Sequence, residues 1–127
     1  MKKIICLLTV ICCCCMAPIQ AQKKMMSQEE FRKRQQMFLT ERAGLTQEEA
    51  KNFFPLYFEL QDKKGAYNKE AWQKMRQGKA ERTTEAEYAK IIEDVLQTRI
   101  TIDQLELEYV RKYKQFLSAK KIYQIQK

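Results

Sequence analysis

The chain has 127 residues, enough for one domain, and carries 24 lysine and arginine residues against 16 acidic ones, a net charge of +8. It contains no histidine, and its five cysteines all lie between positions 6 and 15. The rest of the chain therefore lacks the commonest general base, a cysteine nucleophile and the nitrogen and sulfur ligands of a zinc site. We expect no enzymatic activity, no catalytic residues, no cofactor and no bound metal.

The first 21 residues have the pattern of a secretory signal peptide. Lys2 and Lys3 precede an apolar run over 4–17, and Ala21 is a small residue at the expected cleavage point. The run is too short for a comfortable membrane span, although an uncleaved anchor is the alternative. Lipid attachment is disfavoured, because each cysteine follows isoleucine or another cysteine instead of a small residue. The sequence predicts an exported chain, 22–127, without disulfides; its net charge is +6, because the removed segment holds two lysines and no acid.

Three predicted helix starts share one arrangement, a hydroxyl residue followed three positions later by glutamate. The pairs are Ser27 and Glu30, Thr46 and Glu49, and Thr84 and Glu87. Each pair can form a capping box, in which the hydroxyl and the carboxylate each accept from the other residue's backbone N–H. Ser118 begins a fourth helix, although Lys121 cannot complete the box. Four helices are therefore expected.

The predicted helix ends agree with these starts. Gly44 and Gly78 are suited to the left-handed conformation that ends many helices. The pattern predicts helices over 28–42, 47–77, 85–116 and 119–127, and no strands. Pro55 is expected to kink the second helix, since it removes one backbone donor, and Gly65 is a second weak point.

Apolar residues at helical spacing mark the expected core. In the third helix they recur every seven residues, at Tyr88, Val95, Ile102, Tyr109 and Phe116, and are widened by Ile92, Leu96 and Tyr113. The second helix matches less cleanly, at Ala50, Phe53, Phe54, Tyr57, Leu60, Tyr67, Ala71, Trp72 and Met75. We expect both groups to lie mainly in the core.

The lengths of the helices predict a thin molecule. A helix of about 32 residues is about 48 Å long, whereas a compact domain of this size has a radius of gyration of about 13 Å. Two such helices with two short ones make an elongated, hairpin-like all-α domain over 22–127. Its apolar surface is only partly covered, so we expect a homodimer.

The motif L-T-x-x-Q at a helix start, repeated later in an all-helical exported protein, is typical of the Spy/CpxP family, which this chain resembles over about residues 27–127. The first copy is Leu45, Thr46 and Glu49, and the second begins with Leu117 and Ser118. The run FFPLY at 53–57 is similar to an aromatic–Pro–aliphatic–Tyr run in distant members. The last motif position departs from the family, with Glu49 and Lys121 standing where the family has glutamine.

The resemblance implies an ATP-independent chaperone in the periplasm of a Gram-negative bacterium, active in the envelope stress response. It would be a cradle-shaped antiparallel homodimer that binds unfolded or aggregation-prone envelope proteins on a basic, partly apolar concave face. CpxP-like members instead inhibit an envelope-stress sensor kinase, so a regulatory protein that docks on such a sensor is one alternative. Another is an amphipathic protein that binds the surface of anionic membranes. A zinc-binding branch of the family uses histidine, which this chain lacks.

Flexible apolar and basic side chains are the candidates for client binding, since charge attracts a partner and methionine adapts to many shapes. The candidates are Met26, Phe31, Arg32, Arg34, Met37, Phe38, Lys63, Lys64, Lys74, Met75 and Arg76. The alternative role of the charges is a solvated face, and that of Phe31 and Phe38 is the core. Nucleic acid is not an expected partner of an exported protein.

Overall fold

The computed structural model describes residues 26–127, and the predicted signal peptide lies outside this range. The described chain contains four helices and no strand, which confirms the all-α prediction. The helices are α1 (Gln28–Ala43), α2 (Gln47–Gln77), α3 (Glu85–Tyr113) and α4 (Ala119–Gln126). None of them combines the length and hydropathy needed to cross a bilayer.

The predicted caps form at all four helix starts. Both bonds of the capping box are present at Thr46 and at Thr84, each with the glutamate three positions on. At Ser27 only one half forms: the serine hydroxyl accepts from the Glu30 N–H at 3.2 Å, and the return bond, from the Ser27 N–H to the Glu30 carboxylate, is absent. Ser118 caps α4 through the same single bond, as expected from its sequence.

The second helix ends at Gln77 as predicted, but the structure corrects the conformation expected at Gly78 and the expected end of the third helix. Gly44 adopts the left-handed conformation (φ 61°), but Gly78 does not (φ −66°). A Cβ at Gly78 would lie 3.4 Å from the Tyr88 ring, which is van der Waals contact. The third helix ends at Tyr113, three residues early, because the N–H groups of Gln115 and Phe116 donate three residues back in tight turns.

The second helix runs without interruption through both of its expected weak points. Pro55 and Gly65 lie inside one continuous α2. Because proline has no N–H, the carbonyl of Lys51 lacks its usual donor within the helix. That carbonyl lies on the face of α2 that carries Pro55.

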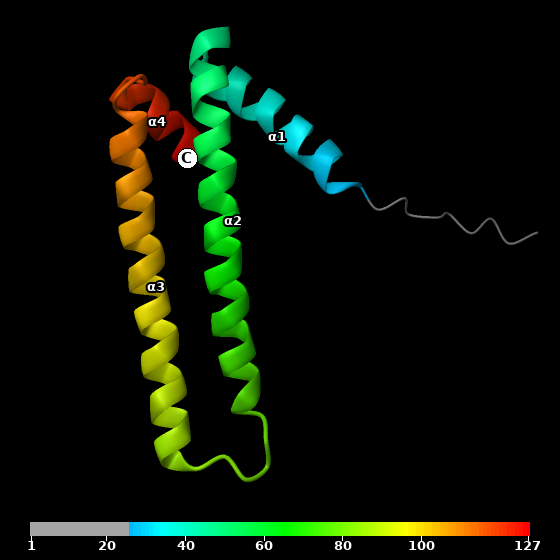
Figure 1. Cartoon of the computed structure of the whole chain (residues 1–127), viewed down its shortest axis with the longest axis vertical. Helices are drawn as coiled ribbons and strands as arrows, with labels where there is room; N and C mark the ends of the chain where they lie inside the picture. The colour runs from blue at the N-terminus through cyan, green and yellow to red at the C-terminus, as the bar shows by residue number, and fades with distance from the viewer. Residues whose placement is uncertain (1–25) are drawn as a thin grey trace, which may run out of the picture.

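The architecture is a long hairpin with two short helices at one end (Figure 1). α2 and α3 lie antiparallel and side by side, while α1 slants outward from the start of α2 and α4 turns back beside the hairpin. The core lies at this end of the molecule. Its buried members are Leu39, Ala43, Leu45, Phe53, Phe54, Leu60, Tyr109, Tyr113, Leu117 and Ile122.

The other half of the hairpin has only a narrow seam. In the core, Phe53 and Tyr109 have no exposed surface. Between residues 61 and 108, by contrast, only Thr98 and Ile102 are buried. Two helices alone cannot enclose a side chain from all directions. Much of the predicted core stripe of the third helix therefore remains in contact with solvent.

Candidate functional site

The hairpin has two different sides, and α4 lies against one of them. Gln61 of α2 and Glu106 of α3 line a cavity together with Ile125 of α4, so both face α4. Residues seven positions apart share a helix face. The same side therefore carries Met75, two heptads after Gln61 on α2, and Ile92, two heptads before Glu106 on α3. We call it the α4 side.

Beyond α4, this side exposes large apolar side chains. Trp72 is 61% exposed and Ile92 is 58% exposed. We call the exposed group of Trp72, Met75, Ile92 and Leu96, together with Tyr88 in the seam beside Gly78, the apolar array. The guanidinium of Arg76 lies over the Trp72 ring, 4.8 Å from the ring centre. The apolar array therefore has a cation at its edge.

The opposite side of the hairpin is covered by ion pairs. Four of them join residues one helical turn apart at 3.0–3.1 Å: Glu59–Lys63, Glu70–Lys74, Lys90–Asp94 and Glu108–Lys112. A longer contact of 3.7 Å, between Lys74 and Asp94, joins α2 to α3. Lys90 lowers the pKa of Asp94, and Glu70 raises the pKa of Lys74. The charges on this side are therefore largely matched within the fold.

Several predicted client-binding cations have partners within the protein. Arg32 donates to Asp62 at 2.7 Å and lies over the Phe58 ring, so it fastens α1 to α2. Lys63 donates to the Tyr109 hydroxyl, and Lys64 pairs with Glu106 of α3. Lys74 belongs to the ion-paired side described above.

Arg34 and Arg76 differ from these cations. Within residues 26–127 neither forms an ion pair, and both are exposed. They are the members of the predicted basic set that keep their charge available to a partner.

The predicted apolar residues of α1 are exposed, so they do not belong to the core. Phe31 and Phe38, seven positions apart, share one face, and Arg42 lies 5.5 Å from the centre of the Phe38 ring. Arg42 also lines a depression with Lys120 and other residues of α4, so this edge of α1 borders α4. Met26, at the start of the described chain, is exposed as well.

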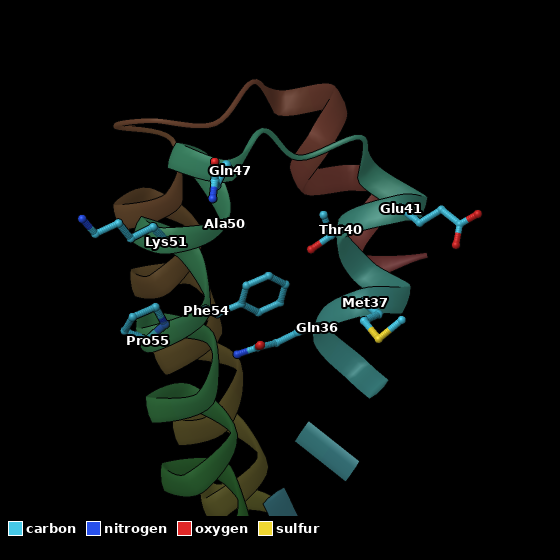
Figure 2. Close-up of a pocket in the computed structure, with 9 residues that line it drawn as sticks. All are labelled: Gln36, Met37, Thr40, Glu41, Gln47, Ala50, Lys51, Phe54 and Pro55. Atoms are coloured by element: carbon cyan, nitrogen blue, oxygen red, sulfur yellow. The ribbon is translucent and has the colours of Figure 1, made fainter. Parts of the chain in front are cut away.

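Met37 lies on a different flank, in a groove between α1 and α2 (Figure 2). Figure 2 shows the Phe54 ring and the Gln36 amide pointing toward each other across the groove, while Lys51 points away. The groove has a volume of about 720 Å³ and is wide open to solvent. The predicted residues therefore form separate patches, with Met75 and Arg76 at the far half of the hairpin and Met37 on α1, facing the groove beside α2.

The two copies of the helix-start motif meet in space. Glu49 accepts from the Thr46 N–H at 2.8 Å and from the Lys121 ammonium at 2.6 Å. These bonds lower the pKa of Glu49, with the Lys121 contribution the larger. Leu45 and Leu117, which open the two copies, are both buried. The motif therefore joins the start of α2 to the start of α4.

Four members of the apolar array were assigned to the core by the sequence pattern alone and were not predicted as a binding surface. Trp72, Tyr88, Ile92 and Leu96 have the spacing of core residues, but they lie beyond the reach of α1 and α4. A signal was present in α3, since Ile92, Leu96 and Ile100 follow at steps of four and drift away from the heptad row. Such a stripe is wider than a two-helix contact can cover.

Comparisons with protein-family models, with curated proteins and with solved structures found no match to this chain.

Proposed function

We propose that the protein is an ATP-independent chaperone that binds unfolded or aggregation-prone proteins on its α4 side. The observation that supports this function is the apolar array, which no other part of the described chain covers. Contiguous exposed apolar patches on soluble proteins usually mark a surface for another molecule. An array of mixed aliphatic, aromatic and methionine side chains suits partners of varied sequence.

Cations next to apolar side chains give a two-step mode of capture. Arg76 and Arg42 each place a guanidinium over an exposed ring, that of Trp72 and that of Phe38 respectively. Long-range attraction speeds encounter with an acidic segment, and apolar contact then holds the chain loosely. Loose binding lets a client leave without an energy source.

The proposal includes the cellular setting expected from the sequence. The chain would be exported by the segment at 1–21 to the periplasm of a Gram-negative bacterium, as a member of the Spy/CpxP family. A second copy would cover part of the apolar surface in an antiparallel homodimer, leaving a cradle-shaped remainder for clients. Membrane contact is not required for this activity.

Suppression of aggregation tests the proposal directly. A chemically denatured client would be diluted into buffer without ATP, with and without residues 22–127, and light scattering would be followed at low and high salt. We expect suppression at about one dimer per client, weaker at high salt because the cations contribute to capture. The variant Ile92→Asn/Leu96→Asn should suppress less, since both side chains are exposed and their loss leaves the core intact.

The matched control is Lys90→Asn, which lies on α3 one turn from Asp94 on the ion-paired side. It should suppress as well as the unchanged protein. If several unrelated clients aggregate equally with and without the protein, the chaperone function is wrong, and a dedicated partner such as an envelope-stress sensor becomes the better proposal.

A further inference from the structure

One face of α1 carries exposed aromatic rings and arginines together. Phe31 is 55% exposed and Phe38 is 57% exposed, and their spacing of seven places them on the same face of the helix. Arg34 stands four positions before Phe38 and Arg42 four positions after it, so both belong to this face. The rings are therefore flanked by guanidinium groups along the length of α1.

This face is turned away from α2. The contacts of α1 with the hairpin use other positions, since Gln35 donates to the Tyr57 hydroxyl at 2.7 Å and Leu39 is buried. Phe31 and Phe38 form no part of the hydrophobic core of residues 26–127. Their exposure is not explained by packing within the chain.

The last helix extends the same surface. Arg42 and Lys120 line one depression of about 490 Å³, and Glu41 is the one acid in its lining. Tyr123 is exposed and follows Lys120 by three positions, so the two share a face of α4. We call this surface the α1–α4 face, and it comprises Phe31, Arg34, Phe38, Arg42, Lys120 and Tyr123.

The cations of the α1–α4 face are available to a partner. Within residues 26–127, none of Arg34, Arg42 and Lys120 forms an ion pair. An isologous contact with a second copy of the chain would bring these like charges together, so a second copy is disfavoured here. The charge and the rings together call for an occupant that is both anionic and apolar.

We propose that the α1–α4 face binds the surface of an anionic phospholipid bilayer. The guanidinium groups donate to lipid phosphates, which match their planar set of donors, and the aromatic rings enter the headgroup region. α1 slants outward from the hairpin (Figure 1), so a planar surface can contact its 16 residues along about 24 Å. The apolar array, at the far half of the hairpin, takes no part. The proposal therefore goes beyond the chaperone function and does not depend on it.

Co-sedimentation of residues 22–127 with lipid vesicles tests the proposal. We expect binding to vesicles of equimolar phosphatidylglycerol and phosphatidylcholine, weaker at high salt, and little binding to phosphatidylcholine alone. Phe31→Ser/Phe38→Ser should weaken binding by about tenfold or more, because two rings no longer leave water. Met37→Ser is the matched control, since Met37 is an exposed apolar residue on the other flank of α1, and it should bind as the unchanged protein does.

A second pair of variants tests the charges. Arg34→Gln/Arg42→Gln/Lys120→Gln should weaken binding by about fivefold for each cation removed. The matched control removes three positive charges from the ion-paired side, in Lys74→Gln/Lys90→Gln/Lys112→Gln. It should bind anionic vesicles far more tightly than the first variant. Equal affinities of the two triple variants would overturn the proposal, because net charge alone would then account for binding.

Trp72, the one tryptophan of the chain, reports on the other end of the molecule. Its emission should not change when vesicles bind, because the apolar array stays in water. A shift to shorter wavelength would place the array in the bilayer and overturn the proposal. Equal binding to neutral vesicles would also overturn it, as would binding of polyglutamate but not of vesicles, which would identify an acidic chain as the partner.

The variant Ile92→Asn/Leu96→Asn separates this proposal from the chaperone function. It should bind anionic vesicles as tightly as the unchanged protein while suppressing client aggregation less, since both substitutions lie in the apolar array. Loss of vesicle binding in this variant would contradict the assignment to the α1–α4 face. Failure of the membrane proposal and failure of the chaperone function are therefore separate outcomes.

Discussion

Glu49 and Lys121, 72 positions apart in the chain, are joined by an ion pair with an Oε2–Nζ distance of 2.6 Å. Each stands three residues after the cap of its helix, so the pair connects the first turns of α2 and α4. The two residues are complementary in charge, so the ion pair can hold α4 against the start of α2.

Reversing the charge of Lys121 should loosen α4. Lys121→Glu places a second carboxylate against Glu49, and a helix of eight residues has little stability of its own. We expect faster amide hydrogen exchange throughout α4 and a lower Tm. Lys120→Glu makes the same charge change at an exposed neighbour and should leave exchange in α4 unchanged. Equal effects of the two variants would show that the ion pair does not hold α4.

Stability should fall in acid. The pKa of Glu49 is lowered by Lys121 and by the Thr46 N–H, and that of Glu87 is lowered by Thr84. A carboxyl group whose pKa is lower in the folded state stabilises the fold above its unfolded pKa. This contribution is lost as pH falls from the ordinary value of 4.5 through the lowered one.

Thermal unfolding between pH 7 and pH 3 measures this effect. We expect a nearly constant Tm down to about pH 5 and a steep decline below it. Glu49→Gln should lower the Tm at pH 7 and flatten the decline, because the substituted residue no longer titrates. A decline as steep in Glu49→Gln as in the unchanged protein would contradict the assignment to this residue.

The two ends of the hairpin should respond differently to the loss of an aromatic ring. Phe53 is fully buried and lies 4.8 Å, centre to centre, from the Tyr113 ring. Phe53→Ala should lower the free energy of unfolding by about 3–5 kcal/mol, because it removes buried surface and leaves a cavity. Urea denaturation measures this value.

Trp72→Ala is the comparison at the far half. The ring is exposed, so we expect a change within about 0.5 kcal/mol. A large loss of stability in Trp72→Ala would mean that the ring is covered in solution, as in a dimer that buries the apolar array. The dependence of its unfolding on protein concentration would then identify the dimer.

The paired and unpaired cations should contribute differently to client binding. Arg76 has its guanidinium at the edge of the apolar array, whereas Lys74 is held by Glu70 on the other side. Arg76→Ala should therefore weaken binding of a denatured client and reduce its salt dependence. Lys74→Ala should do neither, and the reverse ranking would place capture on the ion-paired side. Fluorescence anisotropy of a labelled client at two salt concentrations measures both quantities.

Helix starts could be predicted closely from the sequence, because a cap is decided by a few neighbouring residues. All four helices begin at the predicted position, one residue after their caps. Helix ends were less secure, since they depend on packing: Gly78 is right-handed, whereas the left-handed conformation was expected. The end of α3 at Tyr113 likewise depends on a turn that brings Leu117 into the core.

The candidate site could be predicted only in part. Tyr88 and Tyr109 are three heptads apart on one stripe and look equivalent in the sequence, yet Tyr109 is fully buried and Tyr88 is 41% exposed. What separates them is the position of α1 and α4, which cover one end of the hairpin only. Similarly, the sequence alone suggests that Arg32 is a free cation, but in the folded protein it donates a hydrogen bond to Asp62.

The placement of the core at one end divides the molecule by its local stability. Amides near Phe53 and Tyr109 are protected by four helices and should exchange with solvent only when the whole domain unfolds. Those between about 66 and 100 are held by a two-helix seam and can open while the rest stays folded. The apolar array lies on this separable part, so the surface proposed to receive clients can change shape without loss of the folded end that anchors it.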